Sequence, residues 1–214
     1  MRTSTQATVI GTVLACMWWA GISAASAQVN LGLVGIRSAW GAYLQAQPDG
    51  TLHARTTTAQ AEATWFLIQV NGSQKIYAIY NWQNGQFMSK RGHCAAAVAT
   101  VLGPTEQWRL VSGKRYGMVN AVMFQSVADQ TVLEATRPGK DTECGGEVAV
   151  QDPRGRGDVK RLLRNSSWGG WWVLEPANPP TAGQDVWNKV GGKVGDIPNE
   201  TTPADVTTLL ADLS

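Results

Sequence analysis

A threefold internal repeat constrains the fold of this chain more than any other feature of its sequence. Residues 41–55, GAYLQAQPDGTLHAR, contain two stretches of alternating apolar and polar side chains around a Pro-Asp-Gly turn. Residues 78–90, AIYNWQNGQFMSK, superimpose on them without a gap, and residues 122–135, VMFQSVADQTVLEA, superimpose with one inserted residue in the turn. Because Asp-Gly and Asn-Gly between alternating strands are strong hairpin signals, the sequence predicts three copies of one β unit.

A tryptophan-led apolar strand closes each copy. These strands begin at Trp65, Trp108 and Trp172. An apolar residue lies two positions after each tryptophan, so we expect the three indoles to form a shared core. In this superposition Ile79 and Phe124 correspond to Leu44. Glycine-rich turns and the near absence of helical periodicity indicate an all-β fold in which every strand edge is paired.

This succession of short strands resembles the β-trefoil, and among β-trefoils it is most similar to fascin-like repeats. The resemblance covers residues 34–176 and rests on the YLxAxxDGxLxA pattern of the first copy, followed by Trp-x-Leu. It implies three units of four strands, with a barrel and capping hairpins. The Gln-x-Trp signature of ricin-type lectins is absent, because Gln107 directly precedes Trp108 and Thr64 precedes Trp65. The sugar-binding residues of that family are therefore not carried over.

The first 27 residues predict export. Arg2 precedes an apolar run from Val9 to Ile22, and Ala25-Ser26-Ala27 is typical of a signal-peptide cleavage site. The run is shorter than the about 20 residues of a membrane-spanning helix, so an uncleaved anchor is the less favoured alternative. Val13-Leu14-Ala15-Cys16 resembles a bacterial lipoprotein box, which would be a second processing route. We expect a secreted or periplasmic protein with no transmembrane span in its mature form.

The chain divides into three parts on this basis. They are a signal peptide over residues 1–27, a β-trefoil domain over 28–176, and a C-terminal extension over 177–214 with a Pro/Gly-rich linker and a short helix. Thr202-Pro203-Ala204-Asp205 is typical of a capped helix start. A helix of about ten residues is marginal alone in water. The sequence leaves open whether it packs on the trefoil, binds a partner or stays loose.

Cleavage after residue 27 would leave two cysteines, Cys94 and Cys144. In an oxidising compartment two cysteines predict one disulfide, and the alternative is two separate buried thiols. Both lie between the second and third strands of their units. The resemblance places the trefoil hairpins around the pseudo-threefold axis there, so a bridge is sterically reasonable.

Candidate binding residues are sought where one copy differs from the others, because packing explains what they share. Trp82-Gln83-Asn84-Gly85-Gln86 places an indole at a hairpin tip where the first copy has polar residues. An indole can stack on a pyranose ring while neighbouring amides bind its hydroxyl groups. Trp82, Gln83, Asn84 and Gln86 are therefore candidate carbohydrate-binding residues. The alternative is that Trp82 packs on its own hairpin or on another loop.

The additional residues of the third copy, 151–170, form a second candidate. Their five basic and two acidic side chains give a local charge of +3. Such a loop could bind a sulfated or phosphorylated glycan or another acidic polymer, a lipid headgroup or an acidic protein, and a solvated loop is the alternative. The candidate residues are Arg154, Arg156, Arg161, Trp168 and Trp171.

Catalytic and metal-binding patterns are absent from the sequence. Its only histidines are His53 and His93, and it contains no Gly-x-Ser-x-Gly, phosphate-binding loop or Cys-x-x-Cys. Glu143 and Glu147 flank Cys144 in a predicted loop, and we expect both to be solvated. Only 16% of the residues are charged and the net charge is +2, which does not favour binding to nucleic acid.

These observations together predict a secreted, non-enzymatic β-trefoil without cofactor or metal, whose ligand is a glycan. The alternatives are a module that binds an extracellular protein, as a fascin-like cross-linker or an inhibitor, and a structural envelope protein. The predicted binding residues lie in loops, where a rigid scaffold presents variable side chains.

Overall fold

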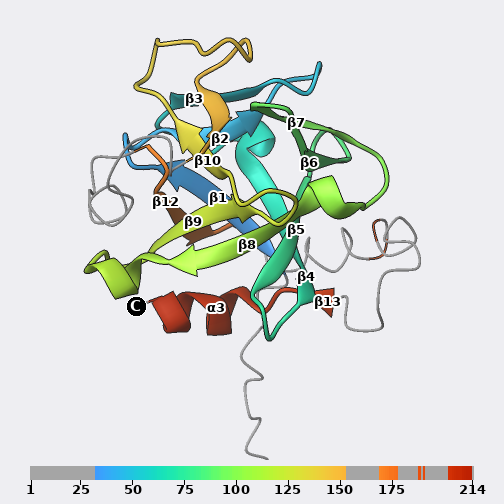
Figure 1. Cartoon of the computed structure of the whole chain (residues 1–214), viewed down its shortest axis with the longest axis vertical. Coiled ribbons are helices and arrows are strands. Elements are labelled where there is room, and N and C mark those ends of the chain that lie inside the picture. The colour runs from blue at the N-terminus through green and yellow to red at the C-terminus, as the bar shows by residue number, and fades with distance from the viewer. Residues whose placement is uncertain (1–31, 153–168, 178–187, 189, 191–201, 214) are drawn as a thin grey trace, which may run out of the picture.

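The computed structural model describes residues 32–152, 169–177, 188, 190 and 202–213, and the predicted signal peptide lies outside these residues. Strands make up most of the described chain (Figure 1). The first unit contains β1 (Leu33–Ser38), β2 (Tyr43–Ala46), β3 (Leu52–Thr56) and β4 (Thr64–Asn71). The second contains β5 (Ile76–Asn81), β6 (Gln86–Arg91), β7 (Cys94–Ala99) and β8 (Gln107–Ser112). The third contains β9 (Ala121–Ser126), β10 (Val132–Ala135), β11 (Val148–Gln151) and β12 (Trp172–Pro176).

The first and last strands of each unit close into a barrel. Strands β1, β4, β5, β8, β9 and β12 pair antiparallel in that order, and β12 pairs back to β1. The middle strands form the hairpins β2–β3, β6–β7 and β10–β11, which gather over one end of the barrel (Figure 1). This arrangement confirms the predicted β-trefoil of three four-stranded units.

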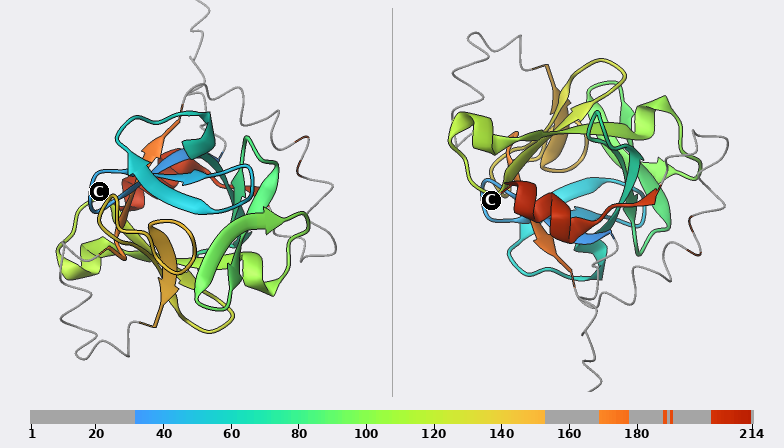
Figure 2. Two further views of the ribbon diagram at one scale, coloured as in Figure 1. Left: turned by 90° about the horizontal axis from the view of Figure 1, so that it is seen from above. Right: turned by 90° about the horizontal axis from the view of Figure 1, so that it is seen from below.

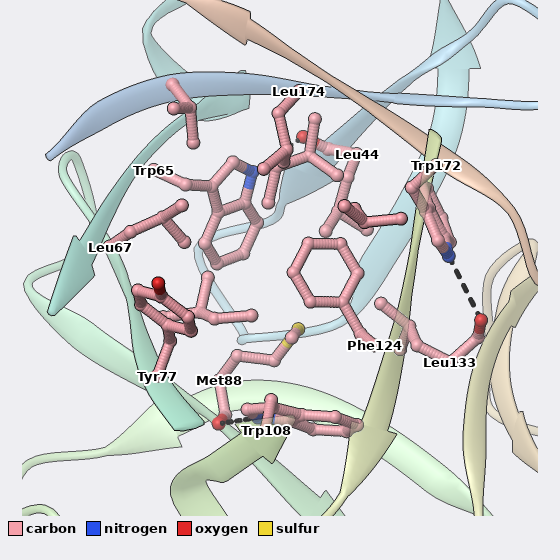
Figure 3. Packing of buried hydrophobic residues seen from close by; sticks show 14 of the residues in the cluster. Leu44, Trp65, Leu67, Tyr77, Met88, Trp108, Phe124, Leu133, Trp172 and Leu174 are labelled. Carbon is pink, nitrogen blue, oxygen red and sulfur yellow. Dashed lines mark hydrogen bonds between the residues drawn. The ribbon is translucent and has the colours of Figure 1, made fainter. Parts of the chain in front are cut away.

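One tryptophan from each unit lies in the barrel core, fully buried (Figure 3). Each indole N–H donates a hydrogen bond to a backbone carbonyl in the second strand of its own unit. The pairs are Trp65 with Leu44 at 2.9 Å, Trp108 with Met88 at 3.1 Å and Trp172 with Leu133 at 3.0 Å. A buried indole needs such an acceptor, because an unpaired N–H in the core would be costly. The threefold repetition confirms the predicted shared core.

The same hydrogen bonds correct the alignment of the copies. Leu44, Met88 and Leu133 are structurally equivalent, so the superposition that matches Leu44 with Ile79 and Phe124 is wrong by one strand. The inserted residue in the turn of the third copy is also wrong. Met88 lies seven residues after the end of β5, and Leu133 lies seven residues after the end of β9, so the two turns have the same length. Alternating patterns occur in consecutive hairpins, and therefore the pattern alone does not decide which strands correspond.

The C-terminal segment packs on the barrel end opposite the hairpins (Figure 2). A short strand, β13 (Thr202–Pro203), pairs with β4, and helix α3 (Val206–Leu213) follows it. Three helix side chains are buried in the main core cluster: Val206, Leu209 and Leu213. Of the alternatives left open by the sequence, the structure shows packing on the trefoil. Tertiary contacts therefore stabilise a helix too short to persist alone in water.

The start of α3 is capped as the sequence predicts. The Asp205 carboxylate accepts hydrogen bonds from the Thr208 backbone N–H at 3.2 Å and from the Thr208 hydroxyl at 2.8 Å. These bonds lower the pKa of Asp205 from its ordinary value.

Within the described residues, no helix is long and apolar enough to cross a membrane.

The predicted disulfide between Cys94 and Cys144 is present, with the two Cα atoms 5.5 Å apart. Cys94 begins β7, and Cys144 lies in the loop between β10 and β11. The bond therefore joins the hairpins of the second and third units on the capped end of the barrel. It closes a sequence separation of 50 residues.

Candidate ligand-binding site

The β5–β6 turn carries the first predicted site. Trp82 is half-buried and packs against a satellite core cluster that includes Phe66, Tyr80 and Phe87. Its backbone N–H donates to the Thr64 carbonyl at 3.1 Å. The indole is therefore held in place by packing, as the alternative interpretation expects, and it still presents part of its surface to solvent.

The amides beside Trp82 differ in what they can offer a ligand. Asn84 donates its side-chain amide to the Gln47 carbonyl at 2.6 Å, so it joins the turns of the first and second units. Gln83 is exposed and Gln86 is half-buried. Asn84 is thus engaged within the protein, and Gln83 and Gln86 remain for ligand contacts.

Ala39 of the first unit and Val127 of the third unit are structurally equivalent to Trp82. Each backbone N–H donates to the carbonyl of the residue that precedes a core tryptophan. The equivalent turn of the first unit, between β1 and β2, contains Trp40. Its indole N–H donates to the Ala135 carbonyl at 3.0 Å, and the Arg137 guanidinium lies 5.3 Å from the ring centroid. The protein itself occupies both the polar edge and one face of Trp40. Trp82 and Trp40 therefore make a natural pair of test and control residues.

The basic insertion lies almost entirely outside the described residues. Arg154, Arg156, Arg161 and Trp168 are among those not described. Trp171 is described, and only 2% of its surface is exposed. Its ring lies 5.8 Å from that of Tyr116, in a small third core cluster. Trp171 is therefore a buried wall residue and not an exposed stacking surface.

Trp171 forms one wall of a cavity of about 330 Å³. The cavity lies beside β12, where it meets the turn between β1 and β2 and the loop between β8 and β9. Its lining residues are Ala39, Gly117, Met118, Val119, Ala121, Trp171 and Val173, all uncharged. These residues come from three distant segments, so no local sequence pattern signals the cavity.

A buried carboxylate lies at the hairpin end of the barrel. Glu147 is fully buried, whereas the sequence predicts a solvated side chain. It accepts a hydrogen bond from the Arg55 guanidinium and bonds to His53 Nδ1 at 2.9 Å. Burial by itself raises the pKa of Glu147, but the bonds from Arg55 and His53 outweigh it and hold the pKa below its ordinary value.

Asp129 is a second carboxylate with a depressed pKa. Burial raises its pKa, but hydrogen bonds from Lys90 and Thr131 outweigh this and lower it to about 2. The Lys90 ammonium lies 2.8 Å from the carboxylate, and this pair links β6 to the β9–β10 turn. Both carboxylates therefore favour the folded state only while they are ionised.

Acidification is expected to destabilise the fold through Glu147 and Asp129. Their folded pKa values are lowered, so their contributions are complete above the unfolded values, 4.5 and 3.8, and are lost as the pH falls below them. Solvent screening limits the contribution of Asp129 to the free energy of unfolding to about 1 kcal/mol, because 41% of that side chain is exposed. Urea unfolding at pH 6 and pH 3 measures the change. The Glu147→Gln variant should show a smaller pH dependence, and an equal dependence would contradict the assignment.

Two groups of possible metal ligands occur among the described residues. One is His93 with Cys94 and Cys144, whose sulfur atoms are joined in the disulfide. The other is His53 with Asp141 and Glu147, and Arg55 binds both of these carboxylates. Existing bonds therefore engage the best ligand atoms of each group.

Solved structures of different proteins share this fold. SeviL bound to asialo-GM1 saccharide matches with a TM-score of 0.50 and 13% identity, over 69% of this chain and 98% of that chain. The Haemophilus ducreyi cytolethal distending toxin matches with a TM-score of 0.52 and 15% identity, over 69% and 85%. The BEL β-trefoil in an apo crystal form matches with a TM-score of 0.50 and 15% identity, over 68% and 93%.

At these identities the likeness shows the β-trefoil fold alone, and the similarity to fascin-like repeats stays a prediction. No protein-family model and no curated protein sequence matches this chain.

Proposed function

We propose that this chain is an exported, non-catalytic β-trefoil that binds a carbohydrate at the β5–β6 turn. The observation that carries the proposal is the indole of Trp82, which packing holds in place while part of it faces solvent. A pre-positioned aromatic surface binds a sugar ring with little loss of conformational entropy. Gln83 and Gln86 are the amides that would bind its hydroxyl groups.

Two further observations support the proposal. SeviL, a protein of the same fold, is bound to a saccharide, so the architecture is compatible with glycan binding. The Cys94–Cys144 disulfide supports export, because disulfides persist in oxidising compartments.

A glycan array tests the proposal with the wild-type chain, Trp82→Ala and Trp40→Ala. We expect the wild type to bind a discrete set of glycans, and Trp82→Ala to weaken that binding by roughly 30-fold, the effect of a strong aromatic anchor. Trp40→Ala is the matched control, because Arg137 covers its ring and the Ala135 carbonyl accepts its N–H. It should bind the same glycans as the wild type.

Folding of each variant is checked by its thermal unfolding midpoint. Gln83→Ala provides a second variant that cannot disturb the core, because Gln83 is exposed. A blank array with the wild type, or unchanged binding by both Trp82→Ala and Gln83→Ala, would rule out a carbohydrate site at this turn.

A further inference from the structure

The cavity beside β12 has a preformed apolar interior that is separate from the β5–β6 turn. Its floor belongs to the third core cluster, in which Ala121, Met123, Val132 and Trp171 are buried. The seven lining residues carry no charged group. A volume of about 330 Å³ is at the lower end of the range of small-molecule sites.

The wall formed by the loop between β8 and β9 is fixed in place. The Met118 backbone N–H donates to the Gly113 carbonyl at 3.0 Å, and the Asn120 N–H donates to the Leu213 carbonyl of α3 at 3.1 Å. A Cβ atom at Gly113 would lie only 2.9 Å from the Ala121 carbonyl oxygen, so the loop lies directly against β9. The opposite wall is fixed by the Ala39 N–H, which donates to the Trp171 carbonyl at 3.0 Å.

The mouth of the cavity has an exposed apolar side chain. Val119 is 68% exposed, and Val101, at 61%, is the other large apolar side chain with comparable exposure among the described residues. Val119 lines this cavity, and Val101 does not. Burial of Val119 against an apolar ligand would therefore remove from water a surface that the fold itself leaves exposed.

Positive charge lies next to the same loop. Lys114 and Arg115 are exposed and belong to the 3-10 helix η3 (Gly113–Tyr116), which leads directly into the lining residues Gly117 and Met118. Neither cation has an ion-pair partner in the part of the chain that the structure describes. On the β12 side, Glu175 is already bound to Arg37 at 2.7 Å. Among the described residues, the charges without an ion-pair partner on the helix that leads into this loop are therefore positive.

We propose that this cavity binds a small amphiphilic anion, that is, an aromatic ring or short acyl chain bearing a carboxylate, sulfonate or phosphate. The apolar group lies against Trp171, Met118 and Val119, and the anion lies near Lys114 and Arg115. A purely apolar ligand would leave the two cations unused, and a purely ionic one would not fill an uncharged cavity. This site does not depend on the carbohydrate proposal, because the two share no residue.

Two fluorescent probes with one skeleton test the proposal on the full chain. They are 1-anilinonaphthalene-8-sulfonate, which is anionic, and N-phenyl-1-naphthylamine, which lacks the sulfonate. We expect the wild type to bind the anionic probe more tightly. Neutralising both cations, Lys114→Gln with Arg115→Gln, should weaken the anionic probe roughly five-fold at low salt and leave the neutral probe unchanged. The matched control neutralises two exposed cations elsewhere, Arg91→Gln with Lys140→Gln, and should change neither probe.

The apolar contribution is tested with a matched pair of valines. Val119→Ser should weaken both probes about three-fold or more, whereas Val101→Ser, at the comparably exposed position, should have no effect. Ala39→Trp, which fills the cavity from an exposed position, should abolish binding of both probes. Circular dichroism establishes that each variant is folded.

Three results would overturn the proposal. The wild type could fail to enhance the fluorescence of either probe, Ala39→Trp could bind as the wild type does, or the two cation pairs could have equal effects. Sedimentation with anionic phosphatidylglycerol vesicles separates a free ligand from a lipid surface. Vesicle binding that persists in Ala39→Trp, without binding of the soluble anionic probe, would assign the basic residues to a membrane and contradict a small-molecule site.

Discussion

Replacing Trp108 with alanine is expected to lower the free energy of unfolding by about 3–5 kcal/mol. The indole is fully buried in the barrel, so its removal leaves a cavity that the surrounding strands fill only in part. The substitution also removes the hydrogen bond to the Met88 carbonyl, which lies in the same core. Loss of a buried hydrogen-bond partner adds to the cost of the cavity.

Urea denaturation followed by circular dichroism measures this change. The same substitution at Trp65 and at Trp172 should have an effect of similar size, because the three indoles are equivalent in burial and in hydrogen bonding. Val101→Ala is the control, and its effect should stay within about 0.5 kcal/mol because the side chain is mostly exposed. A loss below about 1 kcal/mol at all three tryptophans would contradict the shared core.

Removing the disulfide, Cys94→Ala with Cys144→Ala, is expected to lower the free energy of unfolding by about 4 kcal/mol in the chain-entropy model. The bond closes a separation of 50 residues, so its loss gives the unfolded chain many more conformations. In the folded state the bond joins the hairpins of two different units. The variant should therefore keep the β-trefoil while unfolding at a lower urea concentration.

Chemical reduction provides an independent measurement of the same effect. The wild type treated with a dithiol should unfold at the urea concentration of the double variant, and the double variant should not respond to the reductant. Equal unfolding midpoints for the oxidised and reduced wild type would show that the bond does not stabilise the fold. A loss of the anionic-probe site in the double variant is not expected, because neither cysteine lines that cavity.

The candidate site was only partly accessible from the sequence. The hairpin position of Trp82 follows from the local Asn-Gly signal, and the structure has a turn there between β5 and β6. The role of Asn84 does not follow, because its acceptor, the Gln47 carbonyl, lies 37 residues away in another unit. Glu147 lies in a loop three residues after Cys144 and is predicted to be solvated, but Arg55 and His53, more than 90 residues away, bind it in a buried position.

The sequence also shows only part of how the three units correspond, and the structure supplies the rest. Repeated tryptophans and hairpin signals indicate three copies, but alternation with a period of two is alike in neighbouring hairpins and does not distinguish one strand pair from the next. The hydrogen bonds from the indoles to Leu44, Met88 and Leu133 supply that distinction. The equivalent backbone hydrogen bonds of Ala39 and Trp82 then show that the first unit has an alanine where the second unit has Trp82.

The sequence by itself determined the all-β class, the three units, the buried tryptophans and the capped C-terminal helix, because each depends on periodicity, turn residues or spacing within a few tens of residues. Only the tertiary structure decided that α3 packs on the open barrel end, that Glu147 is buried, and that a cavity lies between Ala39, Val119 and Trp171. These features depend on contacts between segments far apart in the chain. Their formation is determined by how the whole barrel closes and not by any local pattern.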